Sequence, residues 1–64
     1  MISDWELWAC ANECIRQHGA DAAIFAAMRA DALMQSGDDE GARTWRAIVT
    51  RIAKLLEPPS HALN

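Results

Sequence analysis

The chain has 64 residues and a formal net charge of −3, which restricts it to one small domain. Its hydrophobic fraction of 52%, with only 3 Gly and 2 Pro, excludes disordered, collagen-like and low-complexity chains. No apolar run reaches the roughly 18 to 20 residues of a membrane span, and the N-terminus lacks the features of a signal peptide, so we expect a cytoplasmic protein. Two cysteines are too few for a disulfide scaffold, and the excess of acids gives no general reason to expect nucleic acid.

Local signals predict a first helix over residues 4–18. Ser3 and Glu6 have the spacing of a capping box, in which each side chain accepts a hydrogen bond from the backbone N–H of the other. Gly19 is expected to end the helix because glycine adopts a positive φ at little cost. Trp5 lies off the apolar stripe, whose members we expect to be buried: Leu7, Trp8, Ala11, Cys14 and Ile15.

A second helix is predicted over residues 22–36, with Asp21 as its cap and Gly37 at its end. The helix is alanine-rich on all sides, and we expect it to contact both other helices. The side chain of Arg29 is expected to be largely buried, with its guanidinium paired with an acid or stacked on an indole as a structural clamp. The two apolar flanks consist of Ile24, Phe25, Met28 and Ala32 on one side, and Ala26, Ala30 and Leu33 on the other.

A third helix is predicted over residues 39–57, because acids at its start suit the helix dipole and Pro58 ends it. Gly41 is expected to admit a neighbouring helix or an indole. Residues 58–64 are predicted to form a tail after a single domain over residues 1–57. We therefore expect an all-α fold, a compact antiparallel three-helix bundle or hairpin assembly. The core side of this helix comprises Trp45, Ile48, Val49, Ile52, Leu55 and Leu56.

Two clusters of residues resemble a known family. They are Glu-Leu-Trp-Ala-Cys-Ala at residues 6–11 and Gln-His-Gly at residues 17–19, and the similarity extends over nearly the whole chain to Leu56. The family consists of short uncharacterised proteins of sphingomonad-type alphaproteobacteria that share a domain of unknown function. The resemblance implies a bacterial cytosolic protein without an assigned activity or catalytic residues. The position of Cys14 is commonly aliphatic in that family, which counts against a two-cysteine site. Further residues that carry the resemblance are Trp5, Arg16, Arg29, Leu33, Gly37, Asp38, Gly41, Trp45, Ile48, Arg51, Ile52 and Leu55.

Three potential metal ligands, Cys10, Cys14 and His18, follow one another at intervals of four residues. Asp21, His61 or a second subunit could supply a fourth. Ligands spread over three helical turns cannot all reach one ion at zinc bond lengths, so we predict no metal and no cofactor. A redox pair of the two cysteines is also disfavoured, because disulfide geometry within a regular helix is poor. The favoured interpretation is a core thiol at Cys14 and a helix-capping role for His18.

The third helix carries most of the cations of the chain on its outer face. This surface is a candidate for binding an anion or an acidic partner, and a nucleic-acid accessory protein is an alternative function. The acids that begin the helix, Asp38, Asp39 and Glu40, would repel phosphate, so a solvated face is the simpler interpretation. The candidate residues are Arg43, Arg46, Arg51 and Lys54.

Three tryptophans, Trp5, Trp8 and Trp45, are difficult to cover in so small a monomer, which makes them candidates for an interface. Trp5 is the best anchor because it lies off the core stripe. No paired carboxylates, activated nucleophile or phosphate-binding loop is recognisable in the sequence. We therefore predict a non-catalytic interaction module that forms a homodimer or binds another cytosolic protein.

Overall fold

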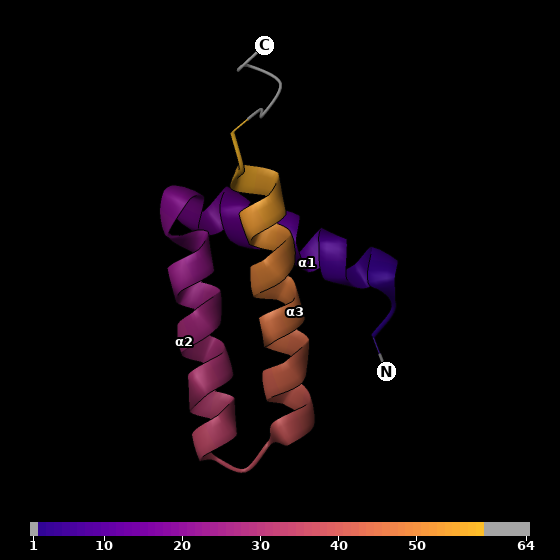
Figure 1. The fold of residues 1–64 in the computed structure, drawn as a ribbon, viewed down its shortest axis with the longest axis vertical. Coiled ribbons are helices and arrows are strands. Elements are labelled where there is room, and N and C mark those ends of the chain that lie inside the picture. The colour runs from indigo at the N-terminus through magenta and orange to yellow at the C-terminus, as the bar shows by residue number, and fades with distance from the viewer. Residues whose placement is uncertain (1, 59–64) are drawn as a thin grey trace.

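The computed structural model describes residues 2–58, and it is all-α over that range (Figure 1). α2 and α3 form an antiparallel hairpin, and α1 crosses it near the end where α2 begins and α3 finishes. The predicted helical hairpin assembly is confirmed, with every helix boundary within one residue of the prediction. All of the predicted tail except Pro58 lies outside the described residues. The elements are α1 (Asp4–His18), the short 3-10 helix η1 (Gly19–Asp21), α2 (Ala22–Gln35) and α3 (Asp39–Leu56).

Local chemistry at the helix ends explains where α1 and α2 begin and stop. The Ser3 hydroxyl accepts a hydrogen bond from the N–H of Glu6 at 3.2 Å, and the Glu6 carboxylate accepts one from the N–H of Ser3 at 2.9 Å. This is the predicted capping box. Gly19 and Gly37 have φ values of 58° and 89°, which residues other than glycine rarely adopt. Each follows a helix, as predicted.

Two predictions about helix starts are wrong. Asp21 makes no capping hydrogen bond to α2, because the chain passes through η1 and continues directly into the helix. Gly41 does not make room for another helix or an indole. A Cβ at Gly41 would lie 2.5 Å from a carboxylate oxygen of Asp38, whose other oxygen accepts the N–H of Gly41 at 2.9 Å. The absence of a side chain at Gly41 therefore leaves room for the carboxylate of Asp38, the N-cap of α3.

The core is built mainly from small side chains, which let the helices approach closely. Ile48 and Ile52 of α3 are its largest fully buried residues. The alanine flank of α2 packs inward. On the other flank, which we expected to contact other helices, Phe25 does contact His18 and Trp45, but Ile24 and Met28 are 61% and 66% exposed. No helix within residues 2–58 has the length and apolar character to span a membrane. The buried residues that form the core cluster are Ala11, Cys14, Ala22, Ala26, Ile48 and Ile52.

Candidate functional site

The outward face of α2 exposes several large apolar side chains. At 100° per residue its exposed members fall on one stripe, opposite the buried Ala26 and Ala30. The charged residues of α2, Arg29 and Asp31, lie on opposite edges of the stripe. We call this stripe the outer seam, and its members are Ile24, Phe25, Met28, Ala32 and Gln35.

The three tryptophans differ in how far the fold covers them. Trp8 and Trp45 are half-buried, whereas Trp5 is 76% exposed. The Arg29 guanidinium carbon lies 5.9 Å from the ring centre of Trp45, so the predicted stacking on an indole is confirmed. Arg29 is nevertheless exposed and not buried as we expected. Of the three interface candidates, Trp5 is the one that the described part of the chain leaves open.

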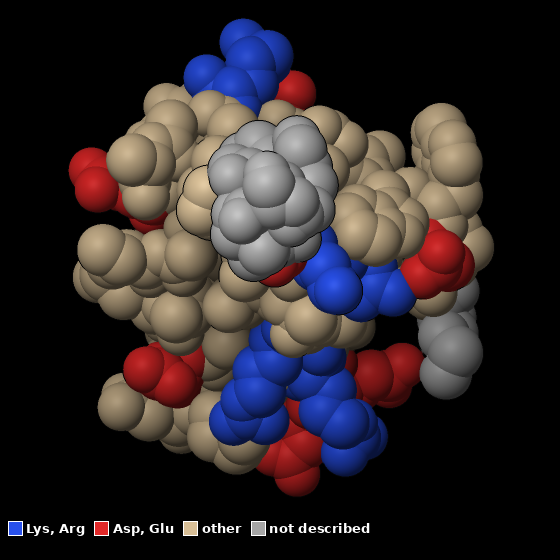
Figure 2. Space-filling model, turned by 45° about the horizontal axis from the view of Figure 1, so that its top comes forward, with Lys and Arg blue, Asp and Glu red and all other residues tan. Residues whose placement is uncertain are grey.

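On the face of the described residues that Figure 2 shows, basic side chains are interspersed with acidic ones, and Lys and Arg lie directly beside Asp and Glu. Arg46 and Lys54 are exposed on α3, as predicted. The juxtaposition of opposite charges weakens the local field that would attract a phosphate backbone.

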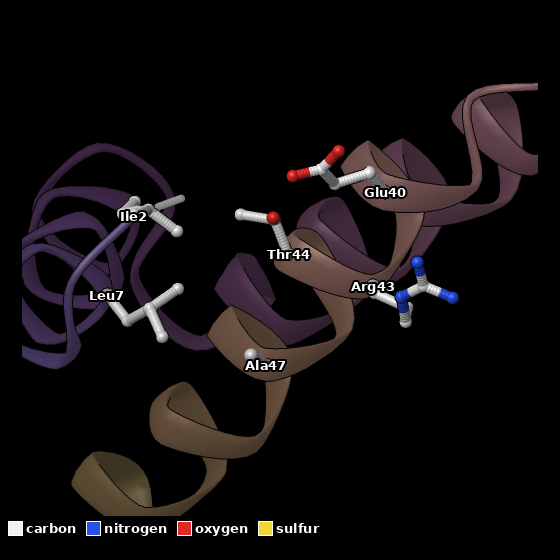
Figure 3. A pocket seen from close by; sticks show the side chains of 6 residues that line it. All are labelled: Ile2, Leu7, Glu40, Arg43, Thr44 and Ala47. Carbon is white, nitrogen blue, oxygen red and sulfur yellow. The ribbon is translucent and has the colours of Figure 1, made fainter.

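Arg43 lines an open cavity of about 330 Å³ between the start of α1 and the first half of α3 (Figure 3). Ile2 and Leu7 approach it from the α1 side, opposite Thr44 and Ala47 of α3. Glu40 also lines the cavity, so an acid accompanies the cation. This combination is unsuited to holding a phosphate.

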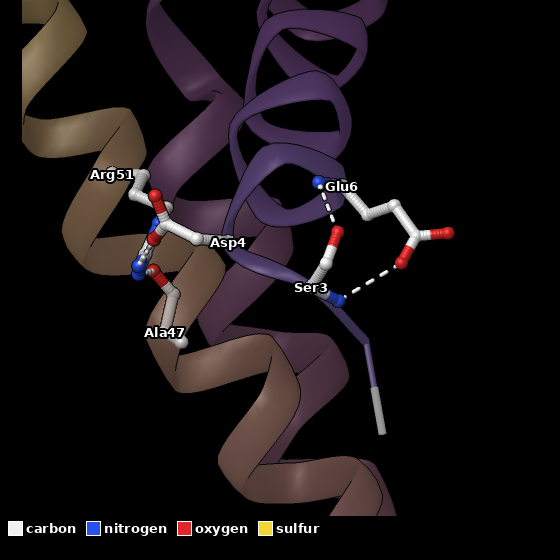
Figure 4. A network of polar contacts seen from close by, with 5 residues as sticks. All are labelled: Ser3, Asp4, Glu6, Ala47 and Arg51. Carbon is white, nitrogen blue, oxygen red and sulfur yellow. Dashed lines mark hydrogen bonds and ion pairs between the residues drawn. The ribbon is translucent and has the colours of Figure 1, made fainter.

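Arg51 does not belong to the outer basic face, which corrects the prediction. Its side chain is only 21% exposed and forms an ion pair with Asp4 of α1 (Figure 4). One Nη also donates to the carbonyl oxygen of Ala47 at 3.1 Å. The guanidinium therefore binds α1 to α3, and a partner's anion would have to compete for it.

The cysteines line a second open cavity, of about 320 Å³, where α1 meets the hairpin. His18 stacks on Phe25 there, with ring centres 4.1 Å apart. Burial raises the pKa of the Cys14 thiol, and the nearby Cys10 and Glu13 act in the same direction. A raised pKa disfavours the thiolate that a nucleophile or metal ligand requires. The lining residues are Cys10, Glu13, Cys14, Gln17, His18, Phe25, Arg29 and Trp45.

Glu13 is the acid of this second cavity, and it is already committed to its neighbours on α1. Arg16 Nε donates to it at 3.0 Å and Gln17 at 2.7 Å. These hydrogen bonds lower the pKa of Glu13 to about 2, so the carboxylate is a poor general base near neutral pH. Within residues 2–58 no three His, Cys, Asp or Glu side chains are grouped to hold a metal ion. His61, a suggested fourth ligand, lies outside the described residues.

The outer seam was missed by reasoning from sequence, although a signal for it exists. α2 contains just two charged residues among 14. A helix that is apolar on every side is normally covered on every side. In this fold α1 packs across one face of the hairpin (Figure 1), where its His18 stacks on Phe25 at one edge of the seam, while Ile24 and Met28 stay exposed among the described elements.

Comparisons with known proteins assign the chain to a family without assigning it an activity. No curated protein and no solved structure matches the chain. The model of a family of unknown function, DUF6961, matches residues 3–59, which is nearly the full length. The expected relationship to a domain of unknown function is thus confirmed. The chain belongs to the DUF6961 family.

Proposed function

We propose that the protein is a non-catalytic helical module that binds another protein chain through the outer seam of α2. The observation that carries this proposal is the exposure of Ile24 and Met28 on a helix whose alanine side is buried. Removing the remaining exposed apolar surface of these side chains from water favours a complex by about 25 cal/mol per Å² before the cost of association. A contiguous exposed apolar surface is typical of a protein interaction site.

The partner in this proposal is a second copy of the chain or another protein of the bacterial cytoplasm. Trp5 offers a second apolar contact on α1, because its indole is exposed and tryptophan is enriched among energetically important interface residues. The alternatives have less support. Arg51 is engaged with Asp4, Glu40 accompanies Arg43, and burial of Cys14 opposes thiolate chemistry.

A comparison of two charge-matched variants tests the proposal. Met28→Glu places a carboxylate in the outer seam, whereas Thr50→Glu adds the same charge at an exposed position of α3. The wild-type protein and both variants are immobilised, and proteins retained from lysate of the native cell, including added labelled copies of this chain, are quantified by mass spectrometry. Circular dichroism checks that each variant keeps its helical content.

We expect the wild type and Thr50→Glu to retain the same partner in equal amounts. Met28→Glu should retain at least tenfold less of that partner, since burying an unpaired carboxylate opposes binding. Equal retention by all three proteins would place binding elsewhere on the molecule. A wild type that retains nothing above an unrelated helical bait would contradict the proposed function itself.

A further inference from the structure

The second cavity, of about 320 Å³, has aromatic walls to which all three α-helices contribute. Phe25 of α2 stacks on His18 of α1 with ring centres 4.1 Å apart, and it lies at 80° to Trp45 of α3 with ring centres 6.1 Å apart. These contacts hold the rings in place before any ligand binds. The volume is at the lower end of the range for small-molecule sites, and the rings favour a planar occupant.

The innermost part of the lining is uncharged. Cys14 is the one lining residue that is buried, and Cys10 beside it is half-buried. Thiols in such positions behave as small apolar groups. Burial raises the pKa of the Cys14 thiol, which keeps it neutral near neutral pH. The interior of the cavity therefore suits an apolar ring.

The rim of the cavity carries two charged groups that differ in how fully they are engaged. The Glu13 carboxylate forms an ion pair with Arg16 and accepts a hydrogen bond from Gln17. The Arg29 guanidinium lies over the ring of Trp45 but forms no ion pair with a carboxylate within residues 2–58. A contact with an aromatic face leaves N–H donors of a guanidinium available to an anion. The uncompensated charge of the cavity is thus positive and lies on Arg29.

We propose that this cavity binds a small planar aromatic carboxylate, with its ring against Phe25 and Trp45 and its carboxylate on the guanidinium of Arg29. A guanidinium donates two parallel hydrogen bonds to a carboxylate, an arrangement that a neutral polar group cannot match. The first cavity does not qualify, because Glu40 accompanies Arg43 there and no aromatic side chain lines it. The site goes beyond the proposed function, since it takes a small molecule and does not require a protein bound to the outer seam.

NMR titration of the backbone and indole N–H groups with naphthoate tests the site on the wild-type chain. We expect a dissociation constant of roughly 0.1–1 mM, because the cavity is open and covers only part of the ligand. The largest shifts should fall on the indole N–H of Trp45 and on the residues of α1 and α2 that line the cavity. No shift up to about 10 mM naphthoate, or shifts centred on the first cavity, would overturn the proposal.

Two related probes separate the contributions of charge and ring. Naphthamide has the same rings without the negative charge, and cyclohexanecarboxylate has the charge without a flat ring. Each should bind about fivefold more weakly than naphthoate or worse, because each lacks one of the two contacts. Equal binding of all three compounds would contradict recognition of an aromatic carboxylate.

Substitution of Arg29 tests which residue holds the carboxylate. Arg29→Gln should weaken binding of naphthoate at least about fivefold and leave that of naphthamide within about twofold, a pattern that a general disturbance of the fold would not give. Arg29→Lys keeps the charge without the planar fork and should be intermediate. Arg46→Gln removes an exposed arginine of α3 that does not line the cavity and should bind as wild type. Equal weakening by Arg29→Gln and Arg46→Gln would overturn the role of Arg29.

A variant of the outer seam keeps this test independent of the proposed function. Met28→Ala changes the seam but no residue that lines the cavity, so it should bind naphthoate as wild type. Phe25→Leu should weaken naphthoate and naphthamide alike, since it removes a ring that both compounds contact. Circular dichroism verifies that each variant keeps its helical content. A Phe25→Leu variant that binds both compounds as wild type would contradict the aromatic wall, whatever the seam-dependent capture experiment yields.

Discussion

The guanidinium carbon of Arg51 lies 5.4 Å from the centre of the Trp8 ring, so a side chain of α3 covers an indole of α1. The same guanidinium forms an ion pair with Asp4, and its Nε is buried without a hydrogen-bond partner among the described residues. A cation held between an aromatic face and a carboxylate fixes the angle at which α1 crosses the hairpin.

Removal of this cation should loosen α1. We expect Arg51→Ala to lower the free energy of unfolding by about 1–2 kcal/mol, since it removes the aromatic contact, the ion pair and the packed stem. Asp4→Asn should cost less than about 1 kcal/mol, because the Asp4 side chain is 73% exposed. Urea denaturation measures both values, and Arg46→Ala is the control at an exposed arginine. Equal losses at Arg46 and Arg51 would contradict this role.

The capping box makes a second, local contribution. Ser3→Ala removes the acceptor for the N–H of Glu6 and should reduce the free energy of unfolding by about 1 kcal/mol. Ser3→Asp keeps an acceptor at the N-cap and should retain most of the stability. Thermal unfolding monitored at 222 nm gives both results. Identical melting of the two variants would mean that the cap contributes nothing.

Acid should destabilise the folded chain through two glutamates of α1. Hydrogen bonds from Ser3 lower the pKa of Glu6, and those from Arg16 and Gln17 lower the pKa of Glu13 to about 2. A carboxyl whose pKa is lower in the folded state contributes stability above its unfolded pKa and loses it as the pH falls through the folded value. The loss is therefore expected between about pH 4.5 and about pH 2.

Glu13→Gln isolates one part of this dependence. Urea midpoints at several pH values should fall less steeply for Glu13→Gln than for wild type, since one titrating group is gone. Parallel pH profiles for the two proteins would show that Glu13 titrates alike in the folded and unfolded states.

Gly41 and Asp38 should show coupled effects on stability. Alanine has a higher helix propensity than glycine by about 1 kcal/mol, but a Cβ at Gly41 displaces the capping carboxylate of Asp38. Gly41→Ala alone should therefore change the free energy of unfolding little. In the Asp38→Ala background the same change should stabilise by about 1 kcal/mol, because no cap remains to be lost. A double-mutant cycle measures this difference, and strict additivity would contradict the contact.

The two thiols should differ in reactivity. Cys14 is buried with a raised pKa and Cys10 is half-buried, so a disulfide reagent at pH 8 should label Cys10 faster than Cys14. Mass spectrometry of the digested protein assigns the labelled site at each time point. In the control variant Cys10→Ser only the slow labelling of Cys14 should remain. Faster labelling of Cys14 would show that α1 opens more readily than its packing implies.

Helix ends could be predicted from the sequence because their causes lie within a few residues. The side chains of Ser3 and Glu6 each accept a hydrogen bond from the backbone N–H of the other across one turn, and Gly19 and Gly37 supply positive φ where the chain leaves α1 and α2. The amphipathic pattern of α3 correctly identified Ile48 and Ile52 as core, but Leu55 and Leu56, predicted on the same side, are 42% and 43% exposed because they lie in the last turn of the helix. The capping features depend on residues within one turn, so they form whichever way the helices pack.

The candidate surface was decided by the tertiary structure. α2 is apolar on both flanks, and the pattern alone could not distinguish which side, that of Ala26 or that of Ile24, would face the hairpin. The alanine side packs inward because small side chains allow the closest approach of three helices. Helical spacing alone likewise places Arg51 on the outer face of α3. In the fold its side chain contacts Trp8 and Asp4 instead, because α1 crosses the hairpin beside it.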